Sequence, residues 1–197
     1  MATPPDNRLK SIERQIWARD KRAPAPVEKW EPDFRGDIDM RIARDGSWHY
    51  QGSPINRIGM VQLFATVLRR DPDGKFYLVT PVEKLGITVD DAPFVAVEMQ
   101  VEGDGTAQQL RFRTNLDDWV DAGPAHPLRI AIDPETQEPS PYVHVRGNLE
   151  ALIARPVFYD LVALCSDHEE DGKTRFGIWS GGQFFAFSDS ADVRGDI

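Results

Sequence analysis

The chain has little sulfur and no long apolar segment. Cys165 is the single cysteine among 197 residues, so an internal disulfide cannot form and structural zinc sites built on several thiolates are excluded. No run approaches the roughly 20 apolar residues that cross a bilayer, and the start of the chain lacks the apolar segment of a signal peptide. We therefore expect a cytoplasmic protein in a reducing compartment, with no membrane span.

Positive charge is also scarce over most of the chain. The formal net charge is −9, whereas nucleic-acid-binding domains usually carry a basic footprint. Residues 1–22 run against this trend with a net charge of +3, so the rest of the chain carries −12. Asp6 followed by Leu9, Ile12 and Ile16 is typical of a capped helix with one apolar stripe. We interpret this arm as a solvated N-terminal helix, and expect no nucleic-acid partner.

Most of the remaining pattern is β-like. A proline-rich strap over 22–32 ends the helix, and Ile38, Met40 and Ile42 then alternate with polar residues as in a strand. Ser53-Pro54 resembles the start of a helix beginning at Ile55. Thr80-Pro81-Val82-Glu83 has the form of a capping box, and the pattern predicts strands over 48–50, 61–69, 75–80, 94–101 and 109–114.

The second half shows a similar order of elements. Asn148 is the expected cap of a short helix through Ile153 that Pro156 ends, and Gly181-Gly182 is best explained as a hairpin turn, although glycine amides there could also form an anion-binding nest. The pattern predicts strands over 128–132, 142–145, 157–165, 174–179 and 184–187.

The two halves align at nearly constant spacing. His49 and Gly52 pair with His144 and Gly147 at an offset of 95, and the DGK runs at 73–75 and 171–173 pair at an offset of 98. Shared order over that length indicates an internal repeat. We predict an α+β fold with a duplicated core of two small, mostly antiparallel β domains with short helices. The predicted parts are residues 1–36 (helix and strap), 37–117 and 118–197.

Several blocks in this order resemble the bacterial family called Domain of Unknown Function 1285. They are GDIDMRIARDGSWHYQGSPINR, LVTPVEKLGITVDDAPF, FRTN, YVHVRGNLEALIARPVFYDLV and WSGGQFFAF, and the resemblance covers about residues 27–188. It implies a duplicated α+β core, a second domain similar to a pleckstrin-homology-like barrel, and a ligand cleft where the domains meet. It also implies a nucleotide-type ligand and a role in signal transduction.

Arginine is the residue type best suited to such a ligand, because its planar fork matches phosphate and carboxylate groups. Arg57 and Arg146 are our candidates for binding an anion, and pairing with local acids is the alternative for both. Arg155 lies in a segment that ends in proline, which favours a structural role.

Histidine and cysteine are weaker candidates for functional residues than arginine. His49 and His144 lie in predicted strands without an HxH, HExxH or CxxC spacing, so we expect no metal and no cofactor. His49 is instead a candidate to contact the ligand. Cys165 and His168 are three residues apart in a predicted strand end, which places them on opposite faces, and we interpret Cys165 as a small buried hydrophobe.

The remaining candidate ligand-binding residues come from the family-like blocks and from tryptophan. Base stacking and core packing are the two alternatives for the tryptophans in strands. These candidates are Trp48, Glu83, Lys84, Thr114, Asn115 and Trp179.

We found neither a paired acid and base nor a metal cluster in the sequence. The sequence therefore favours a binding or sensing protein over an enzyme, with a nucleotide-like ligand held by arginine and an aromatic face. The alternative is a protein-interaction module in which a sheet edge or loop meets a protein partner in signalling. The sequence sets no oligomeric state.

Overall fold

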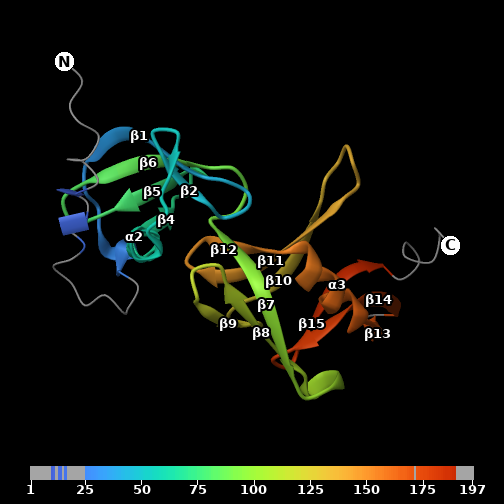
Figure 1. The fold of residues 1–197 in the computed structure, drawn as a ribbon. Coiled ribbons are helices and arrows are strands. Elements are labelled where there is room, and N and C mark those ends of the chain that lie inside the picture. The colour runs from blue at the N-terminus through green and yellow to red at the C-terminus, as the bar shows by residue number, and fades with distance from the viewer. Residues whose placement is uncertain (1–9, 12, 15, 17–24, 171, 190–197) are drawn as a thin grey trace. The chain divides into compact units, whose positions relative to one another are not determined.

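The computed structural model describes residues 10, 11, 13, 14, 16, 25–170 and 172–189. The predicted N-terminal helix therefore lies mostly outside the described residues. Within the described part the fold is mostly β with two α-helices (Figure 1). Contacts divide the chain into unit 1, which comprises residues 1–93 and 147–149, and unit 2, which comprises 94–146 and 150–197. The sequence placed this boundary later, between 117 and 118.

Unit 1 contains one six-stranded sheet. Its strand order is β3-β2-β1-β6-β5-β4, and every neighbouring pair is antiparallel except β1 and β6. The elements are a 3-10 turn η1 (Val27–Lys29), β1 (Phe34–Ile42), β2 (Trp48–Tyr50), β3 (Ser53–Pro54), α2 (Ile58–Ala65), β4 (Leu68–Arg70), β5 (Phe76–Val79) and β6 (Lys84–Val89).

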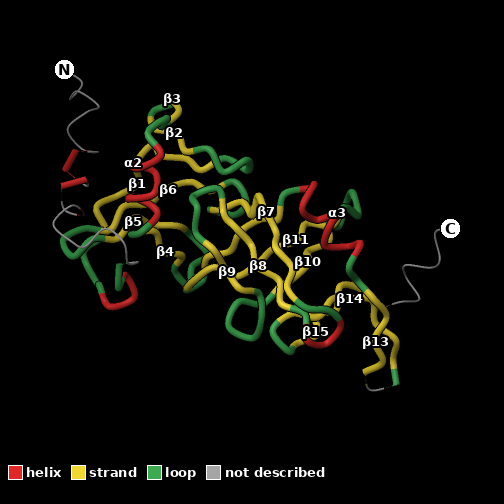
Figure 2. Tube along the Cα trace, turned by 60° about the horizontal axis from the view of Figure 1, so that its bottom comes forward, coloured by secondary structure: helices red, strands yellow, loops and turns green. Residues whose placement is uncertain are grey.

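Unit 2 contains two sheets, one of six strands in the order β10-β11-β12-β7-β8-β9 and one of three strands, β13-β14-β15 (Figure 2). The elements are β7 (Phe94–Glu102), η2 (Gly105–Ala107), β8 (Gln109–Thr114), β9 (Trp119–Asp121), β10 (Leu128–Ile132), β11 (Pro139–Arg146), β12 (Leu149–Ile153), α3 (Arg155–Ala163), β13 (Ser166–Glu170), β14 (Lys173–Ser180) and β15 (Gln183–Asp189).

The repeat appears as one succession of elements in both units. Three strands, a helix and three strands follow one another in β1–β6 with α2, and again in β10–β15 with α3. The units differ in two respects. In unit 2, β7, β8 and β9 form an additional meander, with β7 parallel to β12. The last three strands of the repeat, β13–β15, also form a sheet of their own there, whereas β4–β6 share one sheet with β1–β3.

The offset of 95 does not align the hairpin turns of the two repeats. Gln51-Gly52 separates β2 from β3, and Gly147-Asn148 separates β11 from β12. His49 therefore lies two residues before its turn and His144 three. Since side chains alternate along a strand, this shift of one residue places the two histidines on opposite faces of their respective strands.

Both helices occupy segments for which the sequence predicted strands. Residues 61–65 of the run 61–69, and 157–163 of the run 157–165, are helical. Val61, Leu63, Phe64 and Ala65 are all buried in α2. A run that is apolar on every side suits a buried helix as well as a buried strand.

Of the two predicted short helices, the first begins three residues later than expected, at Ile58 rather than Ile55, and the second is a strand instead. Ser53-Pro54 forms β3, because Gln51 and Gly52 both take positive φ angles of 50° and 74°, which suit a tight hairpin turn. Leu149–Ile153 forms β12. Pro156 lies in the first turn of α3, where a proline without an N–H is favoured, rather than ending a helix before it.

A buried arginine anchors the segment before β1. Arg69 in β4 is 8% exposed, and its Nη1 donates to the carbonyl oxygens of Val27 and Trp30, each at 2.8 Å. Its Nε also donates to Asp71 at 2.6 Å. Covered in this way, the outer edge of β4 is protected from pairing with other chains.

Candidate functional site

Arg57 immediately precedes α2 in unit 1 and is the N-cap residue of that helix. Its backbone is extended, its side chain makes no capping hydrogen bond, and the first turn carries no acidic residue. Arg57, Ile58 and Gly59 are exposed. The free amides at the start of a helix favour anions, and a neighbouring guanidinium adds to that preference.

Arg57 differs from the other arginines of residues 25–189. Each of those has an ion pair, hydrogen bond or ring contact, whereas the side chain of Arg57 has none within the described part of the chain. The partnered arginines are Arg35, Arg41, Arg44, Arg69, Arg70, Arg111, Arg113, Arg129, Arg146, Arg155 and Arg175. The fork of Arg57 is therefore open to a ligand.

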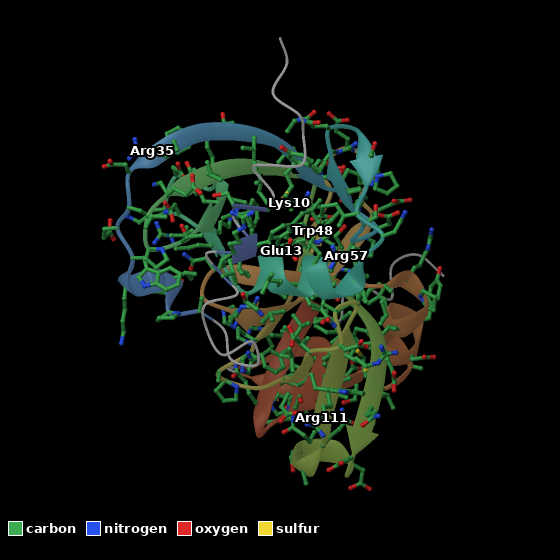
Figure 3. All side chains as sticks on the ribbon, turned by 60° about the vertical axis from the view of Figure 1, so that its left-hand side comes forward. Lys10, Glu13, Arg35, Trp48, Arg57 and Arg111 are labelled. Carbon is green, nitrogen blue, oxygen red and sulfur yellow. The ribbon has the colours of Figure 1, made fainter. Side chains whose placement is uncertain are left out.

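Trp48 lies beside α2 together with Arg57 (Figure 3), but it belongs to the core. The indole is 2% exposed and stacks on Phe64 with ring centroids 6.5 Å apart. Of the two alternatives considered for this tryptophan, the geometry favours core packing over base stacking.

His49 bonds within its own hairpin. Its Nε2 lies 2.9 Å from Ser47 Oγ, which donates to Asp45 Oδ1 at 2.6 Å. The hydrogen bonds from Ser47 hold the pKa of Asp45 below its ordinary value. His49 in β2 therefore bonds to the turn between β1 and β2, and it is half-buried.

Lys84 has a structural role that the sequence did not indicate. Its Nζ lies 3.1 Å from Asp71 Oδ2 and 4.6 Å from the Tyr77 ring centroid. Burial alone would raise the pKa of Asp71, but hydrogen bonds from Arg69 and Lys84 outweigh it and the pKa is lowered. Near it, the carboxylate of Asp73 raises the pKa of Tyr77 to about 12 by accepting its hydroxyl hydrogen.

In the expected capping box, the contacts of the Thr80 side chain form. The amides of Val82 and Glu83 point to Thr80 Oγ1 at 3.4 and 3.2 Å. No helix follows, because β6 begins at Lys84. Glu83 is half-buried beside this turn.

Thr114 and Asn115 hold backbone in unit 2. Thr114 is fully buried, and its Oγ1 accepts from the amides of Leu116 and Asp118 at 3.3 and 3.2 Å. Asn115 Oδ1 accepts from the amide of Val95 at 3.0 Å. Both side chains fix the turn between β8 and β9 against the start of β7.

Arg146, at the end of β11, reaches the same turn. Its guanidinium lies 5.0 Å from the Phe94 ring centroid and 3.6 Å from Asp118 Oδ2, with the side chain 25% exposed. Burial lowers the pKa of Arg146, and the charge of Asp118 opposes that change. Of the predicted site residues, Thr114, Asn115 and Arg146 are thus brought together around residues 94–95.

His144, on the same strand as Arg146, pairs with His126 from the turn before β10. The rings of His126 and His144 have centroids 5.6 Å apart, and His126 Nδ1 lies 3.2 Å from the His144 carbonyl oxygen. The sequence did not single out His126, because its contact with His144 depends on the fold: a bridge between Gly123 and His126 turns the chain before β10.

Trp179 belongs to a cluster of rings on the three-stranded sheet. His168, Trp179 and Phe184 come from three neighbouring strands with centroids 4.8 to 5.5 Å apart. The ring of Phe184 covers Gly177, where a Cβ would meet its Cζ at 2.8 Å. Trp179 is half-buried in this cluster.

The remaining motifs are structural. Gly181-Gly182 forms a two-residue turn between Ser180 and Gln183, as predicted. Asn148 donates to the Arg70 carbonyl oxygen at 3.2 Å instead of capping a helix. Burial raises the pKa of the Cys165 thiol to about 12, so this thiol is a poor nucleophile. Among the described residues no group of three or more His, Cys, Asp or Glu could hold a metal.

The five predicted site residues Trp48, His49, Arg57, Glu83 and Lys84 thus lie in unit 1, and Thr114, Asn115, Arg146 and Trp179 lie in unit 2. Their meeting in one cleft remains a prediction. Within the described residues, no helix combines the length and apolar character that crossing a membrane requires.

Comparison with known proteins places the whole core in one family. Residues 25–92 match the N-terminal domain of the family described as a domain of unknown function, DUF1285, and residues 93–187 match its C-terminal domain. The chain belongs to the DUF1285 family. The junction of the two matches lies next to the boundary between the two units. No protein of curated function matches the chain.

Two solved structures are similar to this chain. A DUF1285 family protein from Silicibacter pomeroyi DSS-3 is 53% identical, with a TM-score of 0.82 over 92% of this chain and 97% of that one. A DUF1285 family protein from Shewanella baltica OS155 is 23% identical, with a TM-score of 0.50 over 64% of this chain and 91% of that one. The second likeness concerns the fold alone.

Proposed function

We propose that this protein binds an anionic, nucleotide-like small molecule and that binding serves a sensing role in signal transduction in the cytoplasm. The observation that carries the proposal is Arg57, whose guanidinium has no partner among the described residues, at the uncapped start of α2. A phosphate group there would meet both the planar fork and the first-turn amides.

The negative charge of the chain restricts the positions at which an anion can bind. A chain of net charge −9 repels free nucleotides over most of its surface, so binding requires a local positive charge that no acid neutralises. Arg44 and Arg41 lie in the same unit but pair with Asp91 and Asp90. The guanidinium groups of Arg41 and Arg44 are thus engaged by carboxylates, whereas that of Arg57 is available to bind an anion.

The test is calorimetric titration of the full chain with nucleoside mono-, di- and triphosphates. Charge-assisted hydrogen bonds contribute roughly 1.5–3 kcal/mol, so Arg57→Ala should weaken affinity about ten- to a hundredfold. Arg57→Lys should lose nearly as much, since lysine lacks the planar fork. The matched control is Arg35→Ala, because Arg35 is also exposed in unit 1 but pairs with Asp33.

Two outcomes would reject the proposal. One is the absence of nucleotide binding by the wild type at millimolar concentration. The other is equal binding by wild type and Arg57→Ala, with unfolding midpoints showing that both are folded.

A second candidate function is a protein-interaction module, and α3 favours it. Tyr159 and Val162 of α3 are 60% and 36% exposed, and Leu164 just after it is 40% exposed, so the end of this helix presents several large apolar side chains to solvent. The pleckstrin-homology-like character that the family resemblance implies for the second domain belongs to this candidate. A photo-crosslinking residue at position 159 should then capture one defined protein, and the same residue at position 35 should not.

A further inference from the structure

The strand β9 is an open edge of the six-stranded sheet in unit 2. It stands last in the strand order, and among the described strands it pairs with β8 alone (Figure 1). The other edges of the two six-stranded sheets differ from it. β3 has only two residues, β4 is covered by the segment before β1, and β10 lies beside β15. β9 is therefore the edge at which a further strand can be added.

The backbone of β9 directs two residues away from the sheet. The Ala122 amide donates to the Leu110 carbonyl oxygen at 2.9 Å, and the Asp118 carbonyl oxygen accepts from an amide of β8 at 2.8 Å. Since the direction of these bonds alternates along an antiparallel strand, the N–H and C=O groups of Trp119 and Asp121 point away from β8. Within the described residues these outward groups have no partner.

Trp119 places an aromatic ring at this edge. The residue is 38% exposed, whereas its neighbour Val120 points to the other face and is 4% exposed. The guanidinium carbon of Arg111 lies 5.5 Å from the ring centroid, and its Nε lies 2.8 Å from Asp121 Oδ1. A ring already held by such contacts loses less freedom when a partner packs on it, and tryptophan is enriched among the residues that dominate protein interfaces.

The charge along this edge is negative. The side chains of Asp117, Asp118 and Asp121 are 56% to 67% exposed. Arg111 and Arg113, which pair with two of them, lie one strand further in on β8 and are 46% and 33% exposed. A strand added to β9 would therefore lie beside carboxylates, on a chain of net charge −9. Such an edge attracts a basic segment and repels the same edge of a second copy.

We propose that β9 binds an extended basic segment of a partner protein, which joins the sheet as an additional strand. The outward backbone groups of Trp119 and Asp121 form the hydrogen bonds of the new ladder. Basic side chains of the segment meet the aspartates, and an apolar side chain packs on the Trp119 ring. The proposal does not depend on anion binding at Arg57.

The test is calorimetric titration of the full chain with a capped peptide of about seven residues in which lysine and valine alternate. Two peptides serve as controls: one has glutamate in place of lysine, and the other keeps the lysines but has N-methylated backbone amides. We expect the lysine peptide to bind in the micromolar range. Both controls should bind about tenfold or more weakly, because one is repelled and the other cannot donate to β9.

Protein variants and amide exchange locate the binding. Trp119→Ala and Asp121→Asn should each weaken binding of the lysine peptide about two- to fivefold. Asp160→Asn is the matched control, since Asp160 is an exposed aspartate of unit 2 that lies on α3, and it should leave affinity unchanged. Saturating peptide should slow hydrogen exchange at the Trp119 and Asp121 amides about tenfold or more. The Val120 amide, which faces β8, should not change.

Several results would overturn the proposal. One is binding of the N-methylated peptide as tightly as the unmodified one, because attraction between charges alone would then explain it. Others are no binding of the lysine peptide at millimolar concentration, or unchanged exchange at Trp119 and Asp121 at saturation. A wild-type dimer that Trp119→Ala abolishes, without peptide binding, would assign the edge to a second copy instead. Arg57→Ala should leave peptide binding unchanged, so this proposal and the nucleotide proposal can fail separately.

Discussion

Ser180 offers the sharpest test of how unit 2 is held together. The residue is fully buried at the end of β14, and its Oγ donates to the Ala122 carbonyl oxygen at 2.7 Å and accepts from the Leu110 amide at 2.9 Å. One hydroxyl thus links the three-stranded sheet to β8 and to the residue after β9. We predict that Ser180→Ala destabilises unit 2 strongly.

The size of this destabilisation depends on which hydrogen bonds the two partners of Ser180 keep in the alanine variant. The Ala122 carbonyl oxygen still accepts from Gln109 Nε2 at 2.9 Å, so losing its bond to Ser180 costs only about 0.5–1.5 kcal/mol. The Leu110 amide loses the acceptor that Ser180 provides inside the protein, which costs about 1–3 kcal/mol. Together the loss is about 2–4 kcal/mol, or a fall of about 1–2 M in the urea midpoint at an m-value near 2 kcal/mol/M.

Two measurements check this prediction. Urea unfolding gives the global loss, and amide hydrogen exchange at Leu110 should accelerate about 30- to 700-fold if that amide exchanges by unfolding of unit 2. Ser166→Ala is the control, since Ser166 is an exposed serine in the same three-stranded sheet and should change stability by less than about 0.5 kcal/mol. A loss for Ser180→Ala no larger than for Ser166→Ala would refute the reasoning.

Two further predictions concern the charged network of unit 1. Because the pKa of Asp71 is lowered in the folded state, its contribution to stability is present above the unfolded-state pKa near 4 and is lost as the pH falls through the folded value. Asp71→Asn should therefore cost about 2–4 kcal/mol at pH 7 and less at pH 3, measured by urea unfolding; an equal loss at both would contradict this. Asp73→Asn should bring the pKa of Tyr77 down from about 12 towards the ordinary 10, measured by tyrosinate absorbance against Tyr77→Phe, and an unchanged titration would show that Asp73 is not the cause.

Hairpins were the part of the fold most readily predicted from sequence. The turn at Gly181-Gly182 formed as expected, and turns at Asp45-Gly46 and residues 71–74 join paired strands in the same way. In each, glycine takes a positive φ that a tight turn requires, so the residues that determine the turn lie within it. Such turns can therefore be predicted from their own residues, without knowing which residues distant in sequence they contact.

Helices were predicted poorly because their causes are not local. The run 61–69 contains β-branched and apolar residues that fit a buried strand, but a helix that buries Val61, Leu63, Phe64 and Ala65 accommodates them equally well. Pro156 was predicted to end a helix, but it lies in the first turn of α3. In both segments, tertiary packing determined where the helix forms.

The candidate site was predicted in part, for similar reasons. Arg57 was chosen for its chemistry, and its lack of a described partner became visible only when the neighbouring arginines were seen with theirs. Lys84 lacked an evident structural role because its partner Asp71 is thirteen residues away in sequence. His126 is absent from the predicted residues because its contact with His144 spans eighteen residues.

The parallel pairing of β1 with β6 has a consequence for synthesis on the ribosome. Phe34 pairs with Lys84, so β1 waits for about 50 further residues, on the order of 3–10 s at 5–20 residues per second. During that interval β1 has only β2 beside it and exposes an unpaired edge. Arg35, Asp37, Asp39 and Arg41 are all exposed and charged, and charges on a waiting strand discourage pairing with other nascent chains. The alternation that marks β1 as a strand therefore also protects it until its partner emerges.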